Sequence, residues 1–173
     1  MRRLLSVVIL SMVFAITASA QIAPPKPDWS PWNWIIGTWD AQGAGKPGTG
    51  AGSFSLLYSL DHAVLLRKSL SSYKAAKTAA RTHHEDFMVL YEESNHWRAD
   101  YWDTERHVIH YGITMGEGVA TFLSDPHPKS PTYRLVYKRM DKGALSVEFA
   151  VAPPGSQEFK TYVSGICQRR PGS

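Results

Sequence analysis

Alternation of apolar and polar residues is the feature of this chain that most limits what it can fold into. In residues 53–60, SFSLLYSL, every second residue from Phe54 to Leu60 is apolar, and serines occupy most of the positions between them. A period of two places alternate side chains on opposite faces of a β-strand. The pattern predicts strands at 34–41, 53–60, 63–73, 86–92, 96–103, 107–114, 118–124, 132–139, 144–151 and 158–168.

Short turn signals separate these stretches and restrict how the strands can be connected. Segments such as EESNH, MGEG and MDKG carry residues that favour turns. Only residues 74–81, KAAKTAAR, have helical propensity, and they can equally form a loop. Strands and helices do not alternate, which excludes parallel α/β folds. An antiparallel sheet of this size removes its edges by closing. We therefore predict an all-β fold, a single antiparallel up-and-down β-barrel of about 8–10 strands that is wide enough for one small ligand.

The N-terminal residues have the pattern of a targeting segment. Arg2 and Arg3 precede an apolar run over 4–16, and the small residues Ala-Ser-Ala end at Ala20. This order is typical of a secretory signal peptide, so we expect residues 1–20 to be removed by cleavage near Ala20 and the protein to be periplasmic or secreted. Residues 21–33 form a proline- and tryptophan-rich lead-in, and residues 34–170 form the barrel domain. Ser30-Pro31 predicts one short helical turn. The tryptophans at 29, 32 and 34 either cover an opening of the barrel or anchor the tail to its surface.

Charge and hydropathy restrict the partners. The formal net charge is +4, and it falls to about +2 when Arg2 and Arg3 are removed with the signal peptide. So small a charge gives no reason to expect nucleic acid as a partner. No second apolar run is long enough for a membrane-spanning helix, so we expect no stable membrane insertion. The expected state is a monomer or a homodimer.

The sequence contains no motif for a metal centre or a catalytic nucleophile. Cysteine pairs and His-x-His are both missing, and His83-His84 beside Glu85 reads as a solvated loop end. There is no Gly-x-Ser-x-Gly elbow, and the single cysteine, Cys167, reads as a small core residue. Residues 43–52, GAGKPGTGAG, read as a flexible hairpin loop. We therefore predict no metal site and no catalytic residue.

Aromatic and polar residues on the predicted strands instead suggest a ligand pocket. Small-molecule sites combine apolar and aromatic walls with a few polar groups, and a tyrosine supplies both. Arg134 alternates with apolar residues, a pattern more often seen on an outer face, and inside the barrel it would need Asp100, Glu148 or an anionic ligand as its partner. A one-residue slip in register exchanges the inward and outward faces. The candidate ligand-binding residues are Tyr91, Tyr101, His110, Arg134, Tyr137 and Tyr162.

Gly37-Thr38-Trp39 at the start of the first predicted strand resembles the signature of the lipocalins, within the broader calycin group. The resemblance implies a lipocalin-like barrel in which Trp39 packs across the closed end beneath an arginine from near the end of the barrel. Arg169 and Arg170 both follow the last predicted strand, and we assign the role to Arg169. The predicted closure residues are therefore Gly37, Trp39 and Arg169, with the arginine and the indole forming a cation–π contact.

Longer stretches resemble an uncharacterised family of bacterial lipocalin-like proteins. They are WIIGTW, WRADYWDTERHVIHY, YRLVYKRM and VEFAVAPPGSQEFKTYVSG, in this order over nearly the whole predicted mature chain. This family has no settled activity, so the resemblance implies a fold and no reaction. A more distant resemblance is to nitrobindin, a ten-stranded barrel that holds haem through a histidine. The chain shows no clear counterpart of that haem-ligand segment, and His110 is the candidate ligand if haem binds.

The leading functional hypothesis is an exported, non-catalytic barrel that binds a small hydrophobic or amphipathic molecule without a cofactor. The alternatives are a haem-binding barrel of the nitrobindin kind and a small enzyme that uses an inward Arg/Asp/His set for acid–base chemistry. A further alternative is a barrel whose interior is filled by side chains and that acts through its surface.

Overall fold

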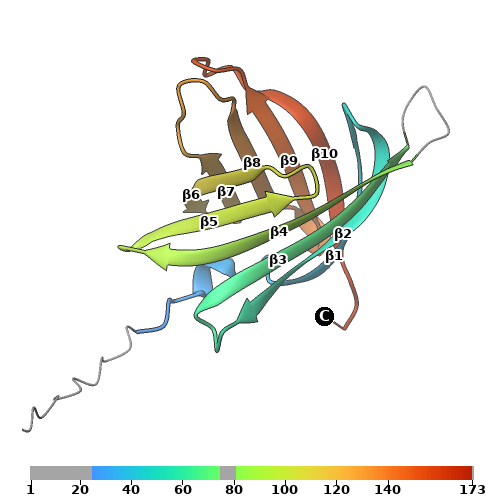
Figure 1. Ribbon diagram of the computed structural model, residues 1–173. Coiled ribbons are helices and arrows are strands. Elements are labelled where there is room, and N and C mark those ends of the chain that lie inside the picture. The colour runs from blue at the N-terminus through green and yellow to red at the C-terminus, as the bar shows by residue number, and fades with distance from the viewer. Residues whose placement is uncertain (1–24, 75–80, 173) are drawn as a thin grey trace, which may run out of the picture.

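Residues 25–74 and 81–172 are described by the computed structural model, and within these ranges ten strands form one closed antiparallel barrel (Figure 1). The strands are β1 (Gly37–Gly45), β2 (Gly48–Ser59), β3 (Val64–Lys74), β4 (Arg81–Glu93), β5 (His96–Asp103), β6 (Val108–Gly116), β7 (Val119–Ser124), β8 (Thr132–Arg139), β9 (Leu145–Ala152) and β10 (Lys160–Arg169). The predicted all-β, up-and-down barrel is confirmed.

Closure of the sheet depends on the pairing of the first strand with the last. Each strand pairs with its sequence neighbours, and β1 also pairs with β10, so that Trp39 lies between Phe54 on one side and Arg169 on the other. All pairings are antiparallel, and the alternation along each strand therefore divides the side chains into an inward and an outward set. One end of the barrel collects the chain reversals after β2, β4, β6 and β8, and the other collects those after β1, β3, β5, β7 and β9.

The strands extend further than the alternation predicts at two places. Residues 43–52, predicted as a flexible loop, instead continue β1 and β2 up to a turn at Lys46-Pro47. Glycine is needed in this part of β1 because β10 comes very close to it. A Cβ at Gly43 would overlap the backbone of Ser164 in β10, and a Cβ at Gly45 would overlap the backbone of Tyr162. Strand β4 begins at Arg81, so His83 and His84 belong to a strand and not to a loop end. Of the predicted helix or loop at 74–81, the two terminal residues pair as strand ends and the residues between lie outside the described part.

The lead-in covers the first of these two ends, which we call the closed end. A short 3-10 helix, η1 (Ser30–Trp32), places Trp29 and Trp32 in the core. The Trp29 ring lies 4.7 Å from the Trp97 ring, and the Trp32 ring lies 6.0 Å from that of Phe122, both of which belong to barrel strands. This packing favours the covering role for the tryptophans over a surface anchor. Figure 1 shows η1 beneath the barrel. The predicted signal peptide, residues 1–20, lies outside the described residues.

Gly37, Trp39 and Arg169 meet at the closed end. The Arg169 guanidinium lies 4.3 Å from the Trp39 ring centroid and donates hydrogen bonds to the carbonyl oxygens of Ile36 (2.5 Å) and Trp34 (3.1 Å). The Trp39 indole is buried and donates to the Ile35 carbonyl at 2.8 Å. Gly37 has a φ of 133°, a conformation that residues with a side chain rarely adopt. The last strand thereby holds the lead-in against the first.

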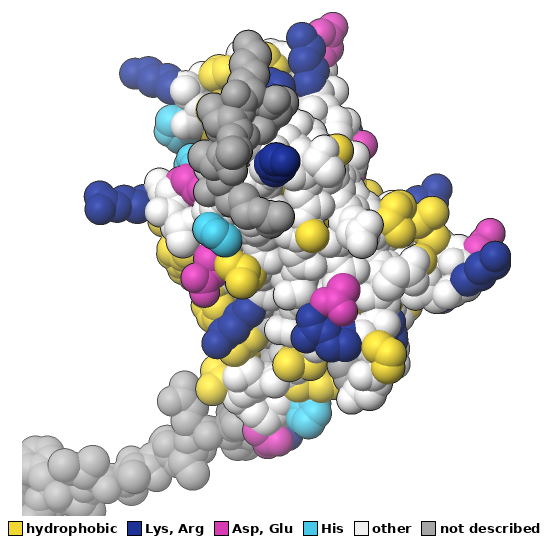
Figure 2. Space-filling model, turned by 90° about the vertical axis from the view of Figure 1, so that its right-hand side faces the viewer, with side chains coloured by type: hydrophobic (Ala, Val, Ile, Leu, Met, Phe, Trp, Pro, Cys, Tyr) yellow, Lys and Arg dark blue, Asp and Glu magenta, His cyan; other side chains and the backbone are white. Residues whose placement is uncertain are grey.

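The outer surface carries charges of both signs. On the face in Figure 2, basic and acidic side chains are interspersed with separate hydrophobic patches. Among the described residues, no helix has the length and hydropathy needed to cross a membrane.

Replacing Arg169 by alanine is expected to lower the free energy of unfolding by about 1–3 kcal/mol, because a cation–π contact and two hydrogen bonds to carbonyl oxygens are lost. Urea denaturation followed by tryptophan fluorescence measures the change. Arg170→Ala is the control, since Arg170 pairs with Asp40 at the exposed surface, where solvent screens the pair, and its loss should cost clearly less than the loss of Arg169. Equal losses in the two variants would contradict the closure role of Arg169.

Candidate functional site

The inward side chains divide the barrel into two halves. Toward the closed end most of them are almost completely buried, with Trp97, Ile113 and Met115 partly buried at its rim. This filled half contains Trp39, Phe54, Leu56, Leu65, Met88, Leu90, Tyr111 and Phe122. Toward the other end, inward side chains remain partly exposed; they are Ser69, Ser71, Tyr73, His84, Tyr101, Tyr133, Val147, Phe149 and Val163. An inward side chain can be exposed only where the interior opens to solvent. We call this second part the open half.

A buried ion pair lies where the filled half ends. Along β3, Leu65 is followed inward by Arg67 and then Ser69, and along β4, Met88 is preceded by Asp86 and then His84. The side chains of Arg67 and Asp86 are only 10% and 6% exposed and form a salt bridge. The Arg67 guanidinium lies 5.3 Å from the Phe54 ring centroid and so contacts the apolar core. Its partner Asp86 lies on the side of the open half.

The electrostatics of the pair favour both charged forms. Burial alone would raise the pKa of the Asp86 carboxyl, but the charge of Arg67 and a hydrogen bond from His84 outweigh burial, and the pKa is lowered from its ordinary value of 3.8. Burial opposes the charge of Arg67 as well, and the attraction of Asp86 more than compensates, so that its pKa is raised. The interior therefore holds a fixed, opposed pair of charges at neutral pH.

His84 connects this pair to the mouth of the barrel. Its Nε2 lies 3.1 Å from the Tyr101 hydroxyl and 3.5 Å from an Asp86 carboxylate oxygen, and its Nδ1 lies 2.7 Å from Oε2 of Glu105. The Tyr101 hydroxyl also donates to Asp103 at 3.2 Å. The hydrogen bond to Asp86 raises the pKa of His84, although burial opposes this effect. A continuous polar chain thus runs from the filled half to the β5–β6 loop.

The remaining titratable groups of the interior are not suited to nucleophilic chemistry. Burial raises the pKa of Tyr137 to about 12 and also raises the pKa of Tyr101 and Tyr111. These hydroxyls stay protonated at neutral pH. Cys167 is fully buried, and burial raises the pKa of its thiol to about 11, so it remains a neutral core side chain.

The structure places two of the six predicted ligand-binding residues inside the barrel. Tyr101 lines the open half, and Tyr137 is buried beside Arg67, whose guanidinium lies 5.9 Å from its ring centroid. Tyr162 is 39% exposed at an irregularity in β10, where the pairing with β9 shifts between Thr161 and Val163.

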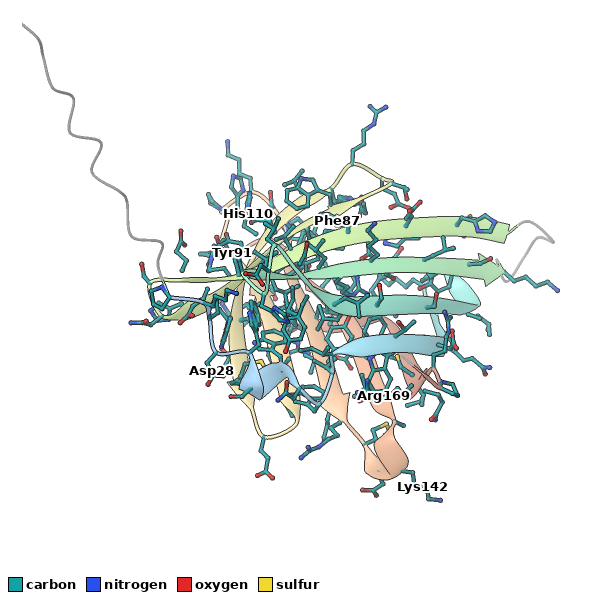
Figure 3. All side chains as sticks on the ribbon, turned by 90° about the horizontal axis from the view of Figure 1, so that it is seen from below. Asp28, Phe87, Tyr91, His110, Lys142 and Arg169 are labelled. Atoms are coloured by element: carbon teal, nitrogen blue, oxygen red, sulfur yellow. The ribbon has the colours of Figure 1, made fainter. Side chains whose placement is uncertain are left out.

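The other three predicted residues project from the outer face, which corrects their expected placement. Tyr91 follows the inward Leu90, and His110 lies between the inward Ile109 and Tyr111. His110 pairs with Asp100 at 2.6 Å, and Arg134 pairs with Glu148 at 3.3 Å. In Figure 3, Tyr91 and His110 lie on the side of the barrel opposite Arg169. In this arrangement His110 cannot reach a haem group inside the barrel.

The sequence analysis missed Arg67, Asp86 and His84 as site residues. A usable signal was present: Arg67 follows Leu65 by two residues, and Asp86 precedes Met88 by two, so both charged residues share the parity of the apolar face. Two opposite charges on the buried face of neighbouring strands predict an interior ion pair, because a buried charge needs a partner. Glu105 gave no comparable signal, since it lies in a loop.

Comparison with known proteins adds no relative: no protein-family model matches this chain, and no curated protein sequence does either.

Replacing Arg67 by methionine is expected to lower the free energy of unfolding at neutral pH by about 3–5 kcal/mol, because Asp86 is left buried and unpaired. The wild-type pair stabilises the fold above pH 3.8, and this contribution is lost as the pH falls below that value through the lowered pKa of Asp86. In the variant, burial raises the pKa of Asp86, so protonation at low pH removes the penalty. Urea denaturation between pH 7 and pH 3.5 should therefore show the difference between the two proteins narrowing.

Lys68→Met is the matched control, because Lys68 is the exposed neighbour of Arg67 on the outer face of β3. Its effect should be small. A constant difference between wild type and Arg67→Met across this pH range would contradict the role assigned to the ion pair.

Proposed function

We propose that this protein is an exported, non-catalytic barrel of the lipocalin-like kind that binds one small amphipathic molecule in its open half. The observation that carries the proposal is the change in burial along the inward face, from nearly complete burial of most side chains below the Arg67–Asp86 pair to partial exposure above it. A barrel that acted only through its surface would have no need of inward side chains in contact with solvent. The contact of Trp39 with Arg169 supports the lipocalin-like assignment, and residues 1–20 support export.

The two walls of the open half differ in chemistry and suggest the class of ligand. On β8 and β9, the Tyr133 and Phe149 rings stack with centroids 5.9 Å apart and an interplanar angle of 11°. Val147 and Val163 extend this apolar wall. Strands β3 and β4 lie across the barrel from β8 and β9 in the strand order, and they contribute hydroxyl groups and His84. A ligand that packs a ring or a short apolar chain against β8 and β9 and directs a polar group toward β3 and β4 would complement both walls.

Acid–base catalysis is a second candidate, and one observation favours it. Arg67, Asp86 and His84 form an inward Arg/Asp/His set, and His84 adjoins carboxylates on two sides. Such a histidine can exchange a proton with a bound molecule. An enzyme would convert its ligand, whereas a binding protein would return the ligand unchanged.

Ligand binding is tested first by native mass spectrometry of protein purified from an exporting host without detergent. We expect a reproducible added mass that denaturation releases and that small-molecule mass spectrometry identifies. Incubating the released compound with fresh protein then distinguishes binding from catalysis. An enzyme would convert the compound into a product of different mass, whereas a binding protein would leave the compound unchanged. A bare protein that gains no mass from a broad metabolite extract would contradict both functions.

A tryptophan placed inside the open half should block binding. Ser71→Trp adds a large side chain on the inward face of β3, and Leu70→Trp adds the same side chain at an exposed outward position next to it. The amphipathic probe 1-anilinonaphthalene-8-sulfonate reports occupancy by its fluorescence. We expect at least about tenfold weaker binding to Ser71→Trp and unchanged binding to Leu70→Trp. The same affinity in both variants would place the probe outside the barrel.

A further inference from the structure

Three potential metal ligands meet at the mouth of the open half. His84 comes from β4, Asp103 is the last residue of β5, and Glu105 lies in the loop that follows. One ligand atom from each lies within 4.8 Å of the others. An imidazole nitrogen with two carboxylates is a donor set that zinc and related divalent transition-metal ions accept. The sequence predicts no such site, because its members do not follow any metal-binding spacing.

The contacts of His84 leave its Nδ1 facing the Glu105 carboxylate, where an ion would bind. Its Nε2 faces the Tyr101 hydroxyl and Asp86, and its Nδ1 faces Glu105. A metal-binding histidine ordinarily donates its other N–H to a carboxylate or another fixed acceptor, which holds the ring and leaves the first nitrogen free to bind the ion. Here that outer acceptor is the Tyr101 hydroxyl, 3.1 Å from Nε2, and Asp86, which Arg67 holds in place, lies 3.5 Å from the same nitrogen.

Asp103 is supported in the same way. Its side chain is only 4% exposed, and it accepts hydrogen bonds from the backbone N–H of His107 at 2.9 Å and from the Tyr101 hydroxyl at 3.2 Å. Tyr101 therefore links two of the ligands: it can accept from His84 while it donates to Asp103. Glu105 is 49% exposed and is the member that can move to meet an ion.

The geometry points to a binding site for a divalent transition-metal ion, with zinc as the expected occupant, held by His84, Asp103 and Glu105 at the rim of the barrel. Two ligand atoms about 2.1 Å from a tetrahedral zinc ion lie about 3.4 Å apart. To bind zinc, the 2.7 Å contact between His84 and Glu105 must open slightly, and any ligand-atom separation nearer the 4.8 Å limit must shorten. A fourth position would face the open half and remain available to water or to a polar group of a ligand. The ion does not need the proposed organic ligand in order to bind, because all three of its ligands come from the chain itself.

Isothermal titration of chelator-treated, otherwise intact protein with zinc chloride tests the site. We expect one ion per chain, and at least about tenfold weaker binding after Glu105→Gln or His84→Gln. Glu105→Gln is the more decisive variant because the residue is exposed and contributes little to the core. The matched control is His110→Gln, which removes a histidine that also contacts a carboxylate, Asp100, but belongs to no three-ligand group within the described part of the chain; the zinc affinity of this variant should be unchanged.

A second pair of variants separates a metal site from a merely structural cluster. Tyr101→Phe removes the hydroxyl between His84 and Asp103 and leaves all three ligands in place, so it should weaken zinc binding about tenfold or more. Tyr133→Phe, the control, removes a hydroxyl from the opposite wall and should leave zinc binding unchanged. The proposal is overturned if the wild-type protein shows no saturable zinc binding, or if Glu105→Gln and Tyr101→Phe bind zinc as tightly as their controls do.

Discussion

Closure of the sheet is the constraint on which the rest of this structure depends. Once β1 pairs with β10, every strand has one face turned to a single shared interior, and each inward side chain must find its place among the inward side chains of the other strands. The close approach of β1 to β10 requires glycine at positions such as Gly43 and Gly45, where any larger residue would strike the facing backbone. The glycine-rich stretch is thus part of the closure and not a loop.

The interior is filled from one end only, and the tryptophans of the lead-in explain why. Trp29 and Trp32 cover the closed end, where most of the inward apolar residues of β2 to β7 are buried. No comparable plug is contributed at the other end by the described residues. The barrel consequently has one closed end and one open end, and the Arg67–Asp86 pair lies between the filled half and the open half.

A buried ion pair is a poor source of net stability, because the cost of removing two charges from water offsets most of their attraction. Well-packed apolar residues could close the core at this level equally well. The pair does hold polar groups in one orientation: Arg67 restrains Asp86, and Asp86 faces the Nε2 of His84. The polar surface at the bottom of the open half is therefore preorganised before anything binds to it.

More of the fold than of the candidate site could be predicted from the sequence. Alternation and turn signals were enough for the strands and the barrel. His110 and Arg134 were nevertheless chosen as pocket candidates, although the pattern favours the outer face for both: Ile109 and Tyr111 beside His110, and Leu135 beside Arg134, form the more apolar face. Those two errors came from weighting chemical interest above burial, which is the stronger force in a strand with one buried face.

What could not be predicted is the meeting of His84 with Glu105. These residues are far apart in sequence, and their contact depends on how the β5–β6 loop turns back over the mouth, which no local pattern specifies. The polar chain then has a consequence for both proposals. An ion at the rim and an organic molecule in the open half would share Asp86, His84 and Tyr101 as neighbours, so each would act on the charge and orientation of the same groups. Binding of one should change the affinity for the other, and by linkage the effect must be reciprocal.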